Sequence, residues 1–182
     1  MRKFACASIG LALAVASTGT GRAYAASPSM LPSQFPGRVL AAHNLVRAQA
    51  GSTQLVWDPT LGTAAARYAL QLAITNTFQH SDRKARPGTG ENLWMGTRGA
   101  YSVETMVGLW ASERRLFVPG TFPNNSRSGN WEDIGHYTQM IWPTTTRVGC
   151  ALASNATTDY LVCRYSPAGN VDGRLVQASQ RY

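Results

Sequence analysis

Beyond its first 25 residues, the sequence lacks the features that mark several classes of protein. No later stretch approaches the roughly 20 apolar residues that a helix needs to cross a bilayer. There is no internal repeat and no low-complexity block. The basic residues are scattered, and the two small clusters at 83–86 and 114–115 have none of the interleaved aromatic residues of a nucleic-acid surface. We therefore expect neither a membrane span nor a nucleic-acid partner.

The first 25 residues have the pattern of a secretory signal peptide. Arg2 and Lys3 supply a charged start, residues 4–16 form an apolar run, and a small-x-small cleavage site ends at Ala25. We expect this segment to be removed, which leaves a soluble protein outside the cell or in the periplasm. Cys6 lies inside the apolar run and would be lost with it.

Acidic residues are scarce in the remainder. Three of the 17 basic residues lie in the leader, so 14 remain against nine acidic ones, and the formal net charge falls from +8 to +5. The 157 residues from 26 to 182 suit one domain with one core. We interpret the moderate positive charge as favouring solubility, with weak attraction to anionic cell surfaces.

Cysteine is equally scarce, because only Cys150 and Cys163 follow the leader. Residues 147–153 and 160–165 are strand-like, and a turn-rich stretch separates them. A hairpin centred between residues 156 and 157 places Cys150 opposite Cys163, which makes a disulfide plausible in an exported protein. Closing this short loop would stabilise the fold by about 3 kcal/mol. Two free thiols are the alternative.

Three stretches show the pattern of helices. Residues 38–50 place four side chains on one face, and Gly51 follows as a stop. The second helix starts at Asp58, a capping acid followed by proline, and the third starts behind Ser102. The side chains that share one face are Leu40, His43, Asn44 and Arg47 in the first helix, Leu61, Ala65, Tyr68 and Leu72 in the second, and Val103, Met106, Val107 and Trp110 in the third.

Two of these helices carry polar residues on the face that we expect to be buried. Asn44 and Arg47 on such a face usually satisfy backbone groups or a helix end, so we interpret them as structural. Glu113 lies three residues past Trp110 and extends its apolar stripe. An acid in that position needs a partner.

Two long loops follow the helical stretches. Residues 76–90 carry His80, and a short strand-like run begins behind them with Glu91. Residues 117–134 are rich in Pro, Gly, Asn and Ser and show no period, which is typical of a functional or mobile loop. We expect this loop to be exposed and to present its three large aromatic residues, Phe117, Phe122 and Trp131.

His136 lies inside the apolar stretch 135–142, which contains two aromatic and two large aliphatic residues. An imidazole is costly to bury in such surroundings unless it is hydrogen-bonded. One interpretation is a core histidine with a single hydrogen bond. The other is a site residue, because His80, Glu91 and Glu113 occur in similarly mixed settings upstream.

Four motifs together resemble those of the CAP superfamily, which comprises cysteine-rich secretory proteins, antigen 5 and plant pathogenesis-related proteins. The two long motifs are GHYTQMIW at 135–142 and YLVCRYSPAGNV at 160–171, and the two short ones are HNxxR from His43 and GENL from Gly90. All four occur in family order. The resemblance implies a lead-in at 26–37, a CAP domain at 38–172 and a tail at 173–182.

The resemblance also implies a fold and a site. The fold would be α+β, a three-layer α-β-α sandwich in which helices flank a small antiparallel sheet. The site would be a cleft tetrad of two histidines and two acids, namely His80, Glu91, Glu113 and His136. Plant-type members carry three disulfides, whereas this chain can form one, which favours a minimal member of the family.

Such a tetrad allows three roles. His80 and His136 can hold a divalent metal, most readily zinc, with the acids binding directly or through water. The four groups can act as general acid and base in a metal-dependent hydrolase or protease. They can also form a buried hydrogen-bonded network. Ser112 adjoins Glu113, but helical neighbours point about 100° apart, so no nucleophile is evident beside the tetrad in sequence.

The resemblance favours an extracellular binding module that acts in defence or host interaction. Its partner would be a sterol or another lipid, or an extracellular protein or cell surface. The loop with Phe117, Phe122 and Trp131 occupies the region that contacts sterol in some relatives. A hydrolase is the second hypothesis. A precursor of a C-terminal signalling peptide beginning near Pro167, as in plant relatives, is the third.

Overall fold

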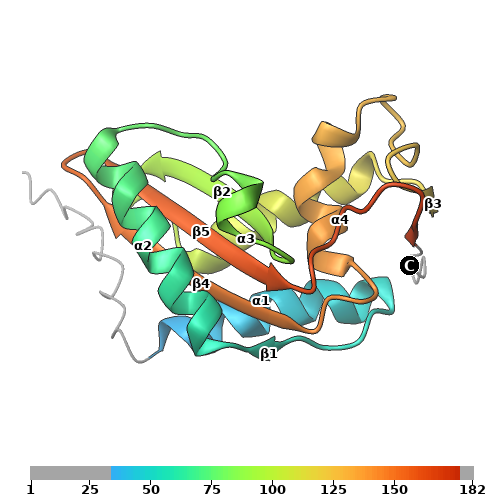
Figure 1. Ribbon diagram of the computed structural model, residues 1–182, viewed down its shortest axis with the longest axis horizontal. Helices are drawn as coiled ribbons and strands as arrows, with labels where there is room; N and C mark the ends of the chain where they lie inside the picture. The colour runs from blue at the N-terminus through green and yellow to red at the C-terminus, as the bar shows by residue number, and fades with distance from the viewer. Residues whose placement is uncertain (1–33, 177–182) are drawn as a thin grey trace, which may run out of the picture.

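A computed structural model describes residues 34–176, so the expected leader, most of the lead-in and the last six residues lie outside the described residues (Figure 1). The helices are α1 (Phe35–Ala50), α2 (Pro59–Thr75), α3 (Val103–Ala111) and α4 (Gly135–Ile141), with short 3-10 helices η1 (Arg83–Ala85), η2 (Ser112–Arg115) and η3 (Trp131–Ile134). The strands are β1 (Val56–Trp57), β2 (Gly90–Thr97), β3 (Gly120–Thr121), β4 (Arg147–Ser154), β5 (Thr158–Ser166) and β6 (Leu175–Val176). No helix in the described part is both long and apolar enough to cross a membrane.

The main sheet has four strands in the order β1-β4-β5-β2. The hairpin of β4 and β5 has the predicted register, with Cys150 opposite Cys163, and the two cysteines form a disulfide. The sheet is antiparallel as expected over β4, β5 and β2, and the two-residue edge strand β1 pairs parallel with β4. The chain passes through α2, β2, α3 and α4 between β1 and β4, and so long a connection permits parallel pairing.

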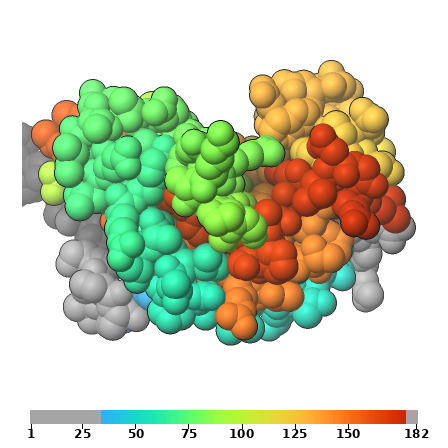
Figure 2. Space-filling model, viewed as in Figure 1, coloured from blue at the N-terminus to red at the C-terminus, as the bar shows by residue number. Residues whose placement is uncertain are grey.

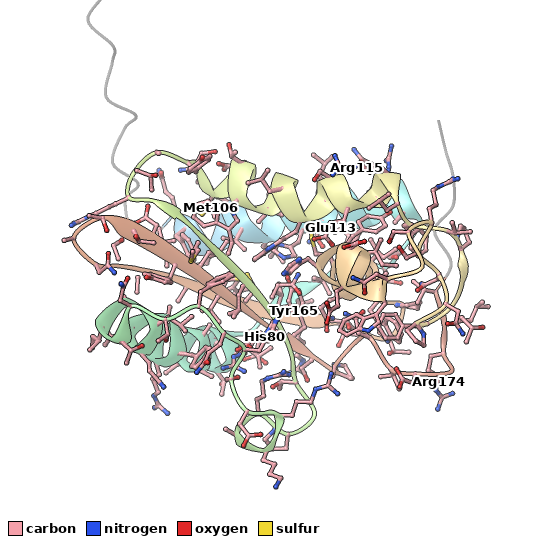
Figure 3. The ribbon with its side chains drawn as sticks, turned by 90° about the horizontal axis from the view of Figure 1, so that it is seen from above. His80, Met106, Glu113, Arg115, Tyr165 and Arg174 are labelled. Atoms are coloured by element: carbon pink, nitrogen blue, oxygen red, sulfur yellow. A yellow bond between two sulfur atoms is a disulfide. The ribbon has the colours of Figure 1, made fainter. Side chains whose placement is uncertain are left out.

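The predicted three-layer sandwich is confirmed. In Figure 3, α2 lies on one side of the sheet, and α1 and α3 lie on the other. Each face has its own apolar cluster: the small residues of α2, such as Ala65 and Ala69, pack with Val162, whereas α1, α3 and α4 enclose the larger core around Trp110. Because α2 is alanine-rich, it lies close to the strands beneath it.

The helix ends follow local sequence rules, with one difference from expectation. Asp58 caps α2 as predicted, because its Oδ1 accepts hydrogen bonds from the backbone of Thr60 and Leu61 at 2.8 and 3.2 Å. The first helix begins at Phe35, three residues before the predicted start. Pro36 lies in its first turn, where a missing N–H leaves no hydrogen bond unmade.

The loop at 117–134 is more ordered than its sequence suggests. It contains β3, which pairs with β6, and the 3-10 helix η3. The expectation that its aromatic residues are exposed is wrong for Phe117 and Phe122, which are both buried. Phe117 packs edge-on against Tyr137, and Phe122 packs against Trp131. These contacts bury apolar area that a solvent-exposed loop would leave in water, and only Trp131 stays partly exposed.

Candidate functional site

His80 and Glu91 form the first of two histidine–carboxylate pairs. The imidazole Nδ1 of His80, in the loop after α2, lies 2.7 Å from Glu91 Oε1 on β2. The side chain of Glu91 is fully buried, whereas that of His80 is about half exposed. Ser81 donates to the same carboxylate through its backbone N–H and its hydroxyl, both at 2.9 Å. The carboxylate of Glu91 is thus held in the interior, and its hydrogen bond holds the imidazole of His80 at the protein surface.

Arg164 on β5 supplies the positive charge that balances Glu91. Its guanidinium lies 3.0 Å from Glu91 Oε2, and Arg86 lies 3.8 Å from the other oxygen. Burial acts to raise the pKa of Glu91. The hydrogen bonds from His80 and Ser81, together with the charge of Arg164, outweigh burial, so the pKa of this carboxyl lies below its ordinary value. Glu91 is therefore an ionised acceptor at neutral pH.

His136 and Glu113 form the second pair. Glu113 lies in η2 at the end of α3, and its Oε1 is 2.6 Å from the imidazole Nδ1 of His136 on α4. Its other oxygen accepts from the backbone N–H groups of His136 and Tyr137, each at 3.0 Å. Trp110 stacks on the imidazole, with ring centroids 5.8 Å apart and planes 15° apart. In Figure 3, Glu113 comes from the α3 side of the sheet, whereas His80 comes from the loop beside α2.

The two ends of α4 are held by charged side chains from other elements. Glu113 accepts from N–H groups in the first turn of α4, where a negative charge is favourable. Arg47 of α1 is fully buried and donates to carbonyls at the other end, where a positive charge is favourable. Its acceptors are the backbone carbonyls of Thr53, Met140, Trp142 and Thr145, at 2.5 to 3.1 Å. The interpretation of Arg47 as a residue that satisfies backbone groups is confirmed.

A neutral hydrogen-bonded chain runs beneath the site. Nδ1 of His43 lies 2.8 Å from the carbonyl of Val39, which can only accept, so Nδ1 carries the proton. Nε2 must then accept from the hydroxyl of Tyr165, 2.8 Å away. Asn92 donates to that hydroxyl and to the carbonyl of His136, both at 3.1 Å. Burial lowers the pKa of His43 to about 4, so the imidazole is neutral.

A cavity of ≈ 950 Å³ lies between the two pairs and extends beyond them. Figure 2 shows it as the hollow between the green segment around residue 80 and the yellow-to-orange segment around residue 130. His80, Glu91 and His136 line the cavity, whereas Glu113 supports His136 from behind. Its lining also includes Phe122, Pro123, Trp131 and Val171, with Glu132 and Asp172 beside them. The site therefore offers both polar and apolar contacts.

The histidines are arranged as metal-binding histidines usually are. Zinc ligands bind through one ring nitrogen and donate the other to a carboxylate. In both His80 and His136, Nδ1 is engaged with a glutamate, which leaves Nε2 for a ligand. Two nitrogen donors fit an open site whose other positions are filled by water or a bound molecule, and they do not fit a closed structural site.

The four residues form two pairs and not one compact cluster. Among residues 34–176, the one group of three or more potential metal ligands whose donor atoms lie within 4.8 Å of one another is His43, Cys150 and Cys163. The two sulfurs of that group are joined in the disulfide, so they provide no thiolates. A metal in the cleft would therefore depend on His80 and His136 together with groups that the metal or its ligand brings.

Hydroxyl groups near the pairs are engaged with other partners. The Ser81 hydroxyl donates to Glu91 and accepts from Arg164 at 3.0 Å. The Thr89 hydroxyl donates to the carbonyl of Arg86 at 3.0 Å. Ser112 donates to the carbonyl of Leu109 at 2.7 Å, in agreement with the prediction that it points away from the tetrad. No hydroxyl in the described cavity lining is hydrogen-bonded to an imidazole, so the geometry offers no activated nucleophile.

Several residues of the site were not singled out from the sequence. Arg164, Ser81 and Asn92 hold the tetrad in place, although Arg164 and Asn92 lie inside the recognised motifs. The signal for Arg164 was its position on β5, where it pairs directly with Glu91 across the sheet. Ser81 lies in a loop, and no periodicity connects a loop residue to a strand.

The fold and the site together define a class: an α-β-α sandwich with two histidine–glutamate pairs at a central cleft. Residues 40–165 match the family model described as CAP, Cysteine-rich secretory protein family. The chain therefore belongs to the CAP family.

Relatives from plants and fungi agree with this assignment. Pathogenesis-related protein 1C of Nicotiana tabacum is 35% identical over 136 residues, which cover 74% of this chain and 76% of that protein. Pathogenesis-related protein PR-1 of Medicago truncatula is 33% identical, over 76% of this chain and 77% of that protein. Secreted protein RBT4 of Candida albicans is 33% identical, but the match covers 82% of this chain and 39% of that longer protein.

Solved structures show the same architecture. The structure described as NaASP2 with Zn²⁺ superposes with a TM-score of 0.65 at 25% identity, over 79% of this chain and 84% of that chain. BmVAL-1 superposes with a TM-score of 0.63 at 27% identity, over 82% and 84% of the two chains. The predicted fold class is thus confirmed by proteins whose sequences have diverged widely.

Proposed function

We propose that the protein is an extracellular binding protein whose cleft holds a divalent cation, preferably zinc, between His80 and His136. The observation that carries this proposal is the pairing of each imidazole, through Nδ1, with a glutamate. This pairing selects the tautomer in which Nε2 has a free lone pair. The Zn²⁺ in the NaASP2 structure supports the same choice of metal.

The chain's own residues would orient the two donor nitrogens. Glu91 is held by Ser81 and Arg164, and Glu113 is held by the first turn of α4, so neither carboxylate can rotate freely. A bound cation would supply a Lewis-acid anchor for an oxygen atom of the ligand. Because two protein nitrogens leave positions open, the ligand itself would complete the coordination.

Zinc titration of the purified protein tests this proposal. We expect the wild type to bind one equivalent and the His136→Ala variant to lose binding by at least about 100-fold. Glu113→Gln should weaken it by about 10- to 100-fold, because it removes the carboxylate that orients the imidazole. Glu132→Gln is the matched control, because Glu132 lines the cavity and has no hydrogen bond or ion pair with either histidine among the described residues. Equal affinity of the wild type and His136→Ala would contradict the proposal, provided that circular dichroism shows both to be folded.

An apolar ligand in the same cavity is a second candidate function. Trp131 lines the cavity with an exposed fraction of 37%, beside Phe122 and Val171. A sterol or fatty acid would bury this apolar area. Titration with a fluorescent sterol should show saturable binding that Trp131→Ser weakens. Val118→Ser is the control, because Val118 is equally exposed and does not line the cavity. Absence of saturable binding by the wild type would eliminate this candidate.

The peptide-precursor hypothesis receives less support. Residues 167–176 are tied into the fold: Gly169 donates to Gln139 at 2.9 Å, and Val176 is fully buried in β6. Release of this segment would expose the core beneath it. Mass spectrometry of the culture medium would detect a released peptide if the hypothesis were right.

Secretion follows from the leader pattern at residues 1–25 and is in line with the name of the relative RBT4, a secreted protein. N-terminal sequencing of protein recovered from the medium should give Ala26 as the first residue. Recovery of the intact chain from the cytoplasm alone would contradict this part of the proposal.

A further inference from the structure

The outer face of α2 is unusually apolar for a helix that faces solvent. Leu70 and Ile74 lie one turn apart on this face, with 54% and 74% of their surfaces exposed. Phe78, just past the end of the helix, is 48% exposed. A solvated helix face normally carries charged residues. The exposed face of α2 has a single charge, Arg67.

The segment that follows α2 returns beside it. The hydroxyl of Tyr68 on α2 donates to the carbonyl of Gln79 at 2.7 Å, which brings the chain after Phe78 back along the helix. Figure 2 shows α2 and this green segment side by side on the face toward the viewer, and Figure 3 shows both on the same side of the sheet. The apolar residues of α2 and the basic turn η1 thus share one face of the molecule.

This face is also almost free of acidic residues. Between Pro59 and Thr89 there are four basic residues and one acid, Asp82. The Asp82 carboxylate accepts from the backbone of Lys84 at 2.9 Å and caps η1. The basic residues are Arg67, Arg83, Lys84 and Arg86.

Three arginines meet in a groove of ≈ 570 Å³ between α2 and the returning segment. Arg67 lines it from the helix, Arg86 from the loop, and Arg164 from β5 below. The Arg164 guanidinium lies 5.3 Å from the centre of the Tyr68 ring, which keeps it at the floor of the groove. Glu91 pairs with Arg164 at 3.0 Å and with Arg86 at 3.8 Å and offsets part of this charge, so a phosphate group seated here would be attracted mainly by Arg67.

We propose that this face docks on a membrane surface that contains anionic phospholipids. Leu70, Ile74 and Phe78 would enter the boundary between headgroups and acyl chains, while Arg67, the η1 basic residues and the groove would contact lipid phosphates. This combination of apolar residues and flanking basic residues is the one that binds an interface without spanning it. A second copy of the chain is a poorer occupant, because a two-fold contact would bring the basic residues of both copies together without acids to pair them.

Vesicle co-sedimentation tests this proposal on protein recovered from the medium. The vesicles contain either phosphatidylcholine alone or phosphatidylcholine with phosphatidylserine. We expect the wild type to bind the phosphatidylserine vesicles at least about tenfold more tightly than the neutral ones, and to release them at high salt. Arg83→Gln with Lys84→Gln should weaken binding about tenfold or more, because each basic residue contributes to the attraction.

Separate variants test the contribution of the apolar residues of α2 to vesicle binding. Leu70→Ser with Ile74→Ser should reduce binding about tenfold or more while leaving the fold intact, because both side chains are exposed. Leu45→Ser with Leu109→Ser is the matched control, because these leucines are 62% and 47% exposed on α1 and α3, on the other side of the sheet. The control should bind vesicles as the wild type does.

Four results would overturn the proposal. The wild type could fail to bind anionic vesicles, or the control could lose as much binding as the α2 variant. The third result comes from sedimentation in solution: an α2 variant that converts a wild-type dimer to a monomer, with vesicle binding unchanged, would show that the face contacts a second copy. Soluble phosphoserine is a probe for the groove alone, so strong binding of phosphoserine with none to vesicles would also count against a membrane.

Discussion

Glu113 and His136 are joined by two hydrogen bonds, one to the imidazole Nδ1 at 2.6 Å and one to the backbone N–H at 3.0 Å. A single carboxylate therefore fixes both the ring of His136 and the start of the helix that carries it. The site and the local fold depend on the same side chain, so a substitution of Glu113 should affect both.

Replacing Glu113 should affect stability and the cleft together. Glu113→Ala removes a helix cap that accepts two backbone N–H groups, and we expect it to lower the free energy of unfolding by about 1–3 kcal/mol. Glu113→Gln keeps an acceptor oxygen and should lower it by less. Urea denaturation measures both values. Similar stabilities for the wild type and Glu113→Ala would show that the cap contributes little.

Stability should fall between pH 6.5 and pH 4 because of His43. Its pKa is about 4 in the folded protein, against 6.5 as the ordinary value, because burial disfavours the charged ring. The unfolded chain then binds a proton in this range while the folded chain does not, so stability present above pH 6.5 is lost as the pH falls toward 4. The loss is on the order of 3 kcal/mol.

Denaturation at several pH values, compared with His43→Asn, checks this expectation. The variant should be less stable at pH 7, since Asn does not reproduce the contacts to Val39 and Tyr165. It should also lose the part of the pH dependence that lies between pH 5 and 6.5. An unchanged slope in the variant would assign that dependence to another group.

Arg47 should be among the residues most sensitive to substitution. It is fully buried, donates to four backbone carbonyls and has no carboxylate partner in the described part of the chain. Arg47→Met removes these hydrogen bonds, and of the four carbonyls that of Trp142 also accepts from the backbone N–H of Thr145 at 3.2 Å. We expect a loss of about 3–5 kcal/mol. Arg114→Met, at an exposed site, should change stability by less than about 0.5 kcal/mol. Thermal denaturation of the two variants provides the comparison.

Two glycine substitutions should have opposite effects. A Cβ at Gly149 on β4 would lie 2.2 Å from the backbone nitrogen of Gly62, so Gly149→Ala would push α2 away from the sheet. We expect it to destabilise the protein by about 3 kcal/mol or more. A Cβ at Gly108 on α3 meets nothing within 4 Å, and Gly108→Ala should stabilise the helix by up to about 1 kcal/mol. Equal stabilities of the two variants would contradict the close approach of α2.

Local rules predicted much of the fold. The capping acid Asp58 and the register that faces Cys150 with Cys163 are set by neighbouring residues, and both are confirmed. The parallel pairing of β1 was not predicted, because a two-residue strand has no period to detect. Phe117 and Phe122 were misplaced for a similar reason: burial in an irregular segment depends on contacts with distant residues and leaves no pattern in the segment itself.

The candidate site was also predicted only in part from the sequence. Glu91 and His136 lie inside recognised motifs, and the resemblance to the family supplied His80 and Glu113. The structure joins each histidine to one acid. Which acid meets which histidine was not predicted, because that depends on how α3 and α4 pack. The roles of Arg164 and Ser81 depend on a strand and a loop far apart in sequence, so only three-dimensional packing reveals them.

The helix that presents His136 has seven residues, fewer than a helix needs to persist alone in water. Its orientation is imposed by ionic groups at its two tips, which come from α1 and η2 and stand outside the cavity wall. Residues of the cavity wall can therefore be changed without disturbing the charged groups that hold α4. Positions such as Glu132 and Asp172 on the rim are suitable for diversification, and a library built there would vary ligand preference on an unchanged scaffold.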